Sequence, residues 1–199
     1  MSYDLFVLSP REEVLTTEQL REDLRNQGWE LRFLVGGASF KSHPQYMPPE
    51  SAGLAASPLL AGWRTNHPKA DVLDQFFEQG LNDRLEKLFM EEDAFSTCGF
   101  SLTAPFHFDA EDTGFDSPDE WRRVVGRKVA DFYPIIRSQY SLHTRGASLV
   151  TGFPFVQAVW QSLGFLSEGL LEDPQTGKNH RVVEKTNIFG HKKRKFEKF

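Results

Sequence analysis

The spacing of the apolar residues constrains the fold most, because it switches repeatedly between a strand pattern and a helix pattern. Residues 3–8 (YDLFVL) form a run rich in β-favouring residues, and residues 29–35 (WELRFLV) alternate apolar with charged side chains. Between them lies TEQLREDLRNQG, which begins at Thr17; Thr16 or Thr17 suits a helix N-cap, and Gly28 suits the helix end. The opening therefore predicts a β-α-β order, with the sheet established by residue 35.

The middle of the chain continues this alternation of helix and strand patterns. Residues 69–90 have apolar side chains at steps of three and four, as a helix with one buried face requires. These side chains are Leu73, Phe76, Phe77, Leu81, Leu85 and Leu88. Residues 98–108 (CGFSLTAPFHF) alternate as a strand does, and Pro105 indicates that at least part of this strand is an edge or a bend.

Two further helices and a turn are predicted towards the C-terminus. Residues 117–120 (SPDE) combine a capping serine, a first-turn proline and a glutamate that can reach back to the cap. The helix that they start has a buried stripe from Trp121 to Ile136, and Pro134 kinks or divides it. A second apolar helix covers residues 154–165, and a short strand at 169–171 precedes the turn signature DPQTG. The inward side chains of that second helix are Phe155, Val156, Val159, Trp160 and Leu163.

These patterns together predict an α+β fold. We expect residues 1–190 to form a single domain with a central mixed or antiparallel sheet flanked by three to four helices, followed by a basic tail at 191–199. Residues 36–67 contain four prolines and no sustained periodicity, so they predict a long irregular excursion, with a helical turn possible at 52–63. Either an ordered surface excursion or a mobile binding loop fits this stretch, and the ordered form is favoured.

Charge is distributed very unevenly along the chain. The 199 residues carry a net charge of −5, but residues 71–120 hold 14 acidic side chains against Arg84 and Lys87, which is −12. Residues 181–199 hold seven basic and two acidic side chains, which is +5. A charge run is often only a solvated face, yet acids on both sides of strand 98–108 would be presented near one sheet end. Such a field favours association with a basic protein.

The acidic residues that we predict to contact this partner form two clusters. They are Glu91, Glu92 and Asp93 before the strand, and Asp109, Glu111, Asp112 and Asp116 after it. The basic tail (HKKRKFEKF) is expected to be solvated. Its alternatives are contact with nucleic acid through its lysines and Phe196 and Phe199, or folding back on the acidic stretch. An acidic body repels phosphates, so we expect no specific nucleic-acid binding.

Catalytic and metal-binding motifs are sparse. Residues 109–120 resemble a calcium loop with Asp109, Glu111, Thr113 and Glu120 as candidate ligands, although a turn followed by a helix cap explains the same residues. His107 and Asp109 share a strand face and offer an acid–base pair, for which a structural histidine is the alternative. The lone Cys98 predicts a buried thiol, and no G-x-S-x-G elbow or phosphate-binding loop is present. No cofactor is predicted.

Two segments of the chain carry a family resemblance. The start MSYDLFVL, through Tyr3, Asp4 and Leu5, and the later segment FPFVQAVWQSLGFLSEGLLEDPQTG, through Asp173, Pro174, Gln175 and Gly177, are similar to small bacterial immunity proteins. These are the immunity proteins of polymorphic-toxin and type VI secretion systems. The resemblance implies a protein made beside its cognate toxin that binds and blocks the toxin without catalysis. An acidic surface would suit a basic toxin that acts on nucleic acid.

The function expected from the sequence is therefore that of a non-catalytic binding protein that neutralises a toxin. An enzyme with a site near His107 and Asp109, and a calcium-binding module at 109–120, are the alternatives. The first residues lack a signal-peptide pattern, and the most apolar later stretch, 153–166, is too short to span a bilayer. We therefore expect a cytoplasmic protein without a membrane partner.

Overall fold

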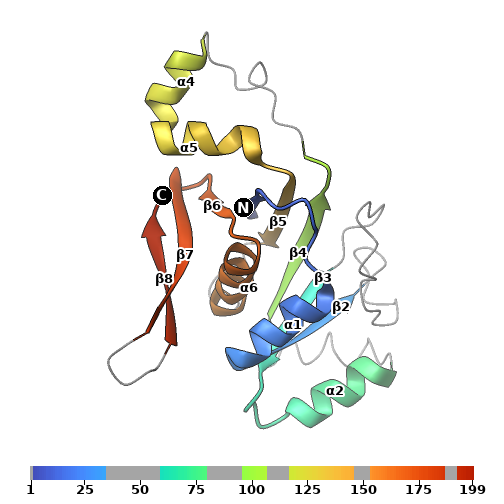
Figure 1. Cartoon of the computed structure of the whole chain (residues 1–199). Coiled ribbons are helices and arrows are strands. Elements are labelled where there is room, and N and C mark those ends of the chain that lie inside the picture. The colour runs from blue at the N-terminus through green and yellow to red at the C-terminus, as the bar shows by residue number, and fades with distance from the viewer. Residues whose placement is uncertain (1, 35–58, 80–95, 107–116, 146–152, 187–191) are drawn as a thin grey trace.

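The computed structural model describes residues 2–34, 59–79, 96–106, 117–145, 153–186 and 192–199. Eight strands form one sheet in the order β2-β3-β4-β5-β1-β6-β7-β8, and every neighbouring pair is antiparallel (Figure 1). The strands are β1 (Ser2–Ser9), β2 (Trp29–Leu34), β3 (Leu59–Arg64), β4 (Ser96–Thr103), β5 (Ser138–Arg145), β6 (Leu170–Asp173), β7 (Lys178–Thr186) and β8 (Lys192–Lys198). The predicted α+β class is confirmed, and the sheet is antiparallel.

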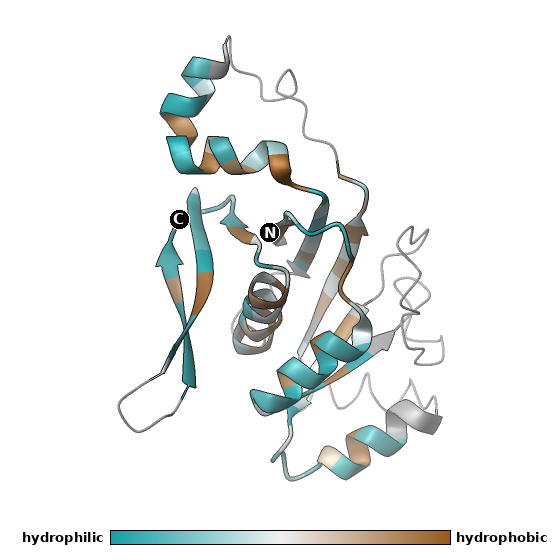
Figure 2. Ribbon diagram, viewed as in Figure 1, coloured by the Kyte–Doolittle hydropathy of each residue, from teal (hydrophilic) through white to brown (hydrophobic). Residues whose placement is uncertain are grey.

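Five α-helices accompany the sheet in the described ranges, where three to four were predicted. They are α1 (Thr17–Asn26), α2 (Ala70–Gln79), α4 (Pro118–Val125), α5 (Arg127–Phe132) and α6 (Phe153–Leu166), with a 3-10 turn, η2, at Tyr133–Ile135. Helices α1 and α6 lie against the same face of the sheet (Figure 1). The hydropathy colouring shows more apolar colour on α6 than on α1, whose outer side is polar (Figure 2).

The main core fills the space between α6, α1 and this face of the sheet. Alternate residues of the strands, such as Leu5, Phe100 and Leu142, face the helices and are almost completely buried. The five side chains predicted to point inward from α6 are all buried, which confirms that part of the prediction. The predicted cap of α1 is also confirmed, because Thr16 and Gln19 form a reciprocal capping box.

A smaller apolar cluster lies on the opposite face at one end of the sheet. Leu8 and Leu170 pack there against Val129 of α5 and against Ile136. The helix predicted over 117–136 starts as expected, with Ser117 accepting from the Glu120 amide at 3.2 Å and Pro118 in the first turn. It divides at Gly126, where φ is +91°, eight residues before Pro134. Pro134 instead lies within η2.

A partly buried carboxyl group, that of Glu172, connects this second cluster to the sheet. The hydroxyl of Tyr133 donates to Glu172 Oε1 at 3.0 Å. Burial raises the pKa of Glu172 above its usual range, although the Tyr133 hydrogen bond partly opposes this. The native state therefore holds the Glu172 proton to a higher pH than the unfolded chain does. The resulting stabilisation is present below the unfolded pKa and is lost as the pH rises through the folded pKa.

Replacing Glu172 by Gln is consequently expected to raise the melting temperature more at pH 7 than at pH 4. The amide oxygen still accepts from Tyr133, while the cost of a desolvated charge disappears at pH 7. Thermal unfolding followed by circular dichroism at both pH values measures this. A variant that loses more stability at pH 7 than at pH 4 would show that the carboxylate is favourably placed, contrary to the expectation.

The stretch 36–67 is not irregular throughout. Strand β3 (Leu59–Arg64) lies within it and pairs with both β2 and β4. The expected helical turn at 52–63 is therefore wrong at its C-terminal end, and residues 35–58 lie outside the described ranges. The strand has no polar alternation because Ala61 and Trp63 on one face and Leu60 on the other are all buried. Such a run does not distinguish strand from helix.

Residues 192–198 of the basic tail also form a strand, which differs from the expectation of a solvated segment at 191–199. Strand β8 pairs with β7 along its whole length, from Lys192 opposite Thr186 to Lys198 opposite His180. Phe196 packs on Trp160 with ring centroids 5.5 Å apart, and Phe199 packs on Phe132 at 5.2 Å. Two aromatic anchors therefore hold the segment to the body of the protein despite its lysines.

Strands β5 and β7 complete the sheet without having been predicted. The SQYSLHTR segment of β5 places Tyr140, Leu142 and Thr144 on one face, which is an alternation that the sequence contains. Strand β5 lies between β4 and β1 and aligns with all eight residues of β1. Its position in the sheet matters for function, because it carries His143.

Candidate functional site

Three polar side chains on neighbouring strands form a connected group on the sheet face opposite α1 and α6. Asp4 comes from β1, His143 from β5 and Ser101 from β4. Their neighbours in each strand, including Leu5, Leu142 and Phe100, point into the main core. Because successive side chains of a strand alternate between faces, the three polar groups lie on the other side of the sheet.

Two hydrogen bonds connect the group in a fixed order. His143 Nδ1 lies 3.0 Å from Asp4 Oδ1, and His143 Nε2 lies 3.4 Å from Ser101 Oγ. The imidazole is therefore placed between a carboxylate and a hydroxyl. The side chains of His143 and Asp4 are 46% and 35% exposed, so the group is accessible from solvent.

The strand register determines this arrangement. Asp4 is directly opposite His143 in the β1–β5 pair, and Gly99 is opposite His143 on β4. Ser101 is two residues beyond Gly99 on the same face. Gly99 itself adds no side chain beside the imidazole, although a Cβ there would meet the Cβ of His143 at 3.4 Å, an ordinary contact. Ser101 reaches the ring from the next position on the same face of the strand.

Two more hydrogen-bonding side chains border Ser101. Ser141 is its direct cross-strand partner on β5, and Gln139 is opposite Thr103. Gln139 Nε2 donates to Ser141 Oγ at 3.2 Å. Side chains in such opposite positions are neighbours on one face of a sheet. The site therefore offers a carboxylate, an imidazole, two serine hydroxyls and an amide on adjacent strands.

The sequence provided no local motif for this group. His143 is 139 residues from Asp4 and 42 residues from Ser101, and only the pairing of β1, β5 and β4 brings them together. The serine is in mid-strand, outside any G-x-S-x-G segment. Predicting β5 from its alternating residues would have placed His143 on the polar face, but not opposite Asp4.

All seven residues predicted to bind a partner lie outside the described ranges. These are Glu91, Glu92, Asp93, Asp109, Glu111, Asp112 and Asp116. The same applies to His107, the proposed acid–base partner of Asp109, and to Thr113 of the calcium loop. Of the calcium candidates, Glu120 is described: its amide completes the Ser117 cap and its carboxylate lies 3.7 Å from Arg123.

The thiol of Cys98 is buried, as predicted. It is 2% exposed within the main core, on the face of β4 opposite Ser101. Burial raises the pKa of the Cys98 thiol to about 12. The nucleophilic thiolate is therefore scarce at neutral pH, and this residue has a packing role.

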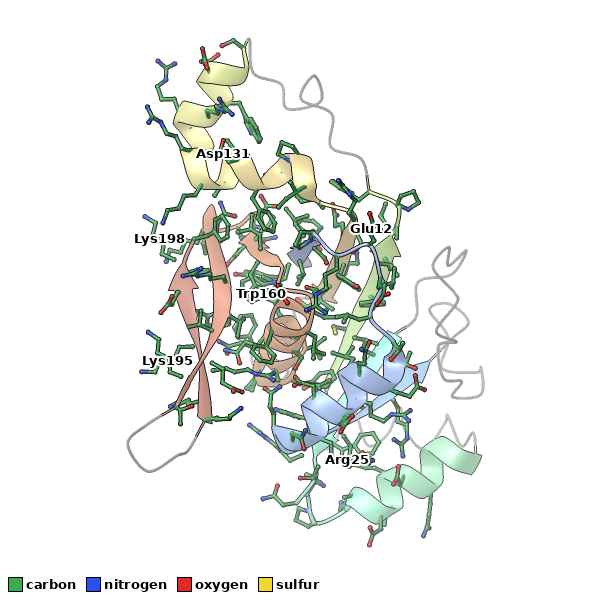
Figure 3. All side chains as sticks on the ribbon, in the orientation of Figure 1. Glu12, Arg25, Asp131, Trp160, Lys195 and Lys198 are labelled. Carbon is green, nitrogen blue, oxygen red and sulfur yellow. The ribbon has the colours of Figure 1, made fainter. Side chains whose placement is uncertain are left out.

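Several cations of β7 and β8 form ion pairs with acids of the same strands or of α1, and others face solvent. Lys192 pairs with Glu184 at 2.7 Å, Lys185 pairs with Glu197 at 2.6 Å, and Arg194 pairs with Asp23 of α1. None of these acids belongs to residues 71–120. Lys195 and Lys198 project from the outer side of the hairpin, away from Trp160 (Figure 3). Because Phe196 and Phe199 are packed against other rings, they are not free to stack on bases.

The residues that carry the family resemblance meet in space. The hydroxyl of Tyr3 donates to Asp173 Oδ2 at 2.6 Å. The pKa of Tyr3 is raised to about 12, mainly by burial and to a smaller extent by this hydrogen bond. Asp173 Oδ1 accepts from the amides of Gln175 and Thr176 and so orders the turn. When the side-chain oxygen of Gln175 faces the Asp4 amide, it accepts a hydrogen bond from Asp4 N at 3.0 Å, and the Gln175 nitrogen donates to the Asp4 carbonyl. Both segments thus support the position of β1, which carries Asp4.

Metal ligands do not cluster in the part of the chain that the structure describes: no three His, Cys, Asp or Glu side chains there gather closely enough to hold an ion. No helix in the same ranges is long and apolar enough to cross a membrane. Comparison with protein-family models, with curated proteins and with solved structures found no match to this chain.

Proposed function

We propose that the protein binds and neutralises a basic protein partner, as immunity proteins do with their cognate toxins. The acidic stretch 71–120 would supply the contact surface through the two clusters at 91–93 and 109–116. The support is its charge of −12 over fifty residues, together with the resemblance of residues 3–5 and 173–177 to immunity proteins.

The position of the basic C-terminal segment supports this proposal most directly. If that segment folded back on the acidic stretch, it would cancel much of the charge available to a partner. In the structure it forms β8, in which Lys192 pairs with Glu184 and Arg194 pairs with Asp23. Of the described acids between 71 and 120, Asp74 pairs with Arg32 and Glu120 with Arg123. Among the described residues, Lys192 and Arg194 of this segment are therefore paired with acids outside residues 71–120.

A contact surface with this charge would act mainly on the rate and selectivity of association. Complementary potentials raise association rates by factors of about 10 to 1,000 at low salt. They also disfavour acidic or neutral competitors, because like charges placed opposite each other cost free energy. A toxin that handles nucleic acid needs a basic surface of its own, and this is the partner chemistry that the acidic stretch complements.

Co-purification tests the proposal. The full chain, carrying an affinity tag, is co-expressed with the product of the adjacent gene, since immunity proteins are encoded beside their toxins. We expect the two products to elute together at low salt and the toxicity of the neighbour to be suppressed. Elution of the tagged chain alone at low salt, with toxicity unchanged, would contradict the proposal.

A further inference from the structure

The group formed by Asp4, His143 and Ser101 has the order of a nucleophile, a base and an orienting carboxylate. Hydrolases that use a serine nucleophile need the hydroxyl within reach of one imidazole nitrogen and the carboxylate on the other. His143 meets this requirement, with Ser101 Oγ at 3.4 Å from Nε2 and Asp4 Oδ1 at 3.0 Å from Nδ1. We propose that these three residues form a hydrolytic site for carboxylic esters, a function separate from partner binding by the acidic stretch.

Each residue has a distinct role in this site. Asp4 Oδ1 accepts a hydrogen bond from Nδ1–H of His143, so that Nε2, which faces Ser101, is the nitrogen without a proton. His143 is the general base, and Ser101 is the nucleophile. The Ser101–His143 distance is slightly long for a hydrogen bond, as is common before a substrate is bound. The β1–β5–β4 ladder holds all three backbones in register, so the group does not depend on a loop for its geometry.

The neighbouring donors fit the charge that develops in such a reaction. When a hydroxyl adds to an ester carbonyl, the carbonyl oxygen becomes negative and needs hydrogen-bond donors nearby. The Ser141 hydroxyl is directly across from Ser101, and the Gln139 amide is next to Ser141 on the same face. These two side chains are the donors that we assign to the developing oxyanion. Both come from β5, the strand that also carries the base.

The reaction uses only the ester and water. Ser101 Oγ bonds to the carbonyl carbon while its proton moves to His143 Nε2. The tetrahedral adduct then expels the alcohol, which takes that proton, and an acyl group remains on Ser101. A water molecule next loses a proton to His143 and attacks the acyl carbon. The carboxylic acid leaves as Ser101 regains its proton, so the enzyme returns to its starting state with one ester bond hydrolysed.

The site is open, which determines the substrates to test first. His143 is 46% exposed and Asp4 is 35% exposed, so water screens their interaction, and we expect a modest rate on small reactive esters. p-Nitrophenyl acetate is the substrate probe, and a fluorophosphonate that bonds covalently to activated serines is the labelling probe. Neither requires knowledge of the natural ester.

The labelling experiment uses the unmodified full-length chain. We expect one fluorophosphonate adduct per molecule, located by peptide mass spectrometry on Ser101. Failure of the folded chain to form this adduct under conditions that label a known serine hydrolase would overturn the proposal. This arm does not depend on whether any variant folds, or on whether a protein partner is bound.

The hydrolysis experiment compares Ser101→Ala, His143→Ala and Asp4→Asn with a matched control, Ser96→Ala. Ser96 is on the same strand but five residues away, on the opposite face of the sheet. Loss of the nucleophile or of the base is expected to lower p-nitrophenyl acetate hydrolysis by roughly 100-fold. Asp4→Asn should lower it less and change its pH profile, and Ser96→Ala should leave it unchanged. Equal hydrolysis by wild type and Ser101→Ala, both folded by circular dichroism, would show that these two hydrogen bonds have only a structural role.

Discussion

Gly62→Ala is expected to lower the free energy of unfolding by about 3 kcal/mol, the upper end of the usual cost of overpacking a core. A Cβ at this position would lie 1.9 Å from Cε2 of Phe155, well inside van der Waals contact. Phe155 is fully buried between α6 and the sheet and also packs on Trp29 at a ring-centroid distance of 5.4 Å. The ring therefore has no room to move, and β3 or α6 must shift. Urea unfolding followed by circular dichroism measures the effect.

Two variants show whether the ring of Phe155 is the cause. Gly99→Ala on the adjacent strand is the matched control, because a Cβ there meets its nearest neighbour at 3.4 Å, an ordinary contact. We expect it to cost less than about 1 kcal/mol. In the double variant Gly62→Ala/Phe155→Leu, the smaller side chain leaves room for the methyl group. The double variant should therefore be more stable than the sum of the single effects predicts. Strict additivity would contradict the packing explanation.

Arg194→Leu is expected to destabilise the protein by about 3 kcal/mol, because it leaves the buried charge of Asp23 without its partner. Both terminal nitrogens of the Arg194 guanidinium donate to the carboxylate of Asp23, whose side chain is 10% exposed. The guanidinium also lies 3.8 Å from the ring centroid of Phe165. This pair is the polar attachment of β8 to α1. Hydrogen exchange in β8 should therefore accelerate along with the loss of global stability.

The control for this prediction is an exposed ion pair in the same hairpin. Lys192→Leu removes the contact with Glu184, in which the lysine side chain is 67% exposed. Exposed pairs contribute little, so we expect a change below about 1 kcal/mol. In Asp23→Asn/Arg194→Leu no buried charge remains, and part of the lost stability should return. Similar losses in the free energy of unfolding for Lys192→Leu and Arg194→Leu would show that the buried pair contributes no more to stability than the exposed pair.

Local signals in the sequence were sufficient to predict the elements that have their own apolar spacing or their own capping residues. Helix α1 has its capping box, and α6 has an apolar face that packs as expected. Strand β3 was missed because it is buried on both faces and contains Gly62, whose absent side chain makes room for a ring from α6. Nothing within residues 59–64 shows that requirement.

The C-terminal strand was missed for a different reason. Its five basic residues suggest a solvated tail, since such a composition rarely fills a core. What orders β8 is distant in sequence: Asp23 is 171 residues from Arg194, and Trp160 receives Phe196. Contacts between residues so distant in the sequence cannot be predicted from local sequence patterns.

The candidate site illustrates the same limit. The sequence contains both Asp4 and His143, and Asp4 is part of the segment that resembles immunity proteins. Their contact depends on β1 and β5 pairing across 139 residues, with Gly99 and Ser101 placed by a third strand. The acidic stretch, by contrast, could be identified from the sequence alone. Charge is a property of composition, so it could be recognised without any knowledge of the fold.

The central claim is that the acidic stretch drives binding of a basic partner, and association kinetics test it most directly. The rate is measured by surface plasmon resonance against the product of the adjacent gene, with wild type, Glu91→Lys/Glu92→Lys/Asp93→Lys and, as control, Glu12→Lys/Glu13→Lys outside the stretch. We expect the triple variant to associate at least about 10-fold more slowly at low salt, with the difference shrinking as salt rises, and the control to stay near wild type. Equal association rates for all three proteins would contradict the claim.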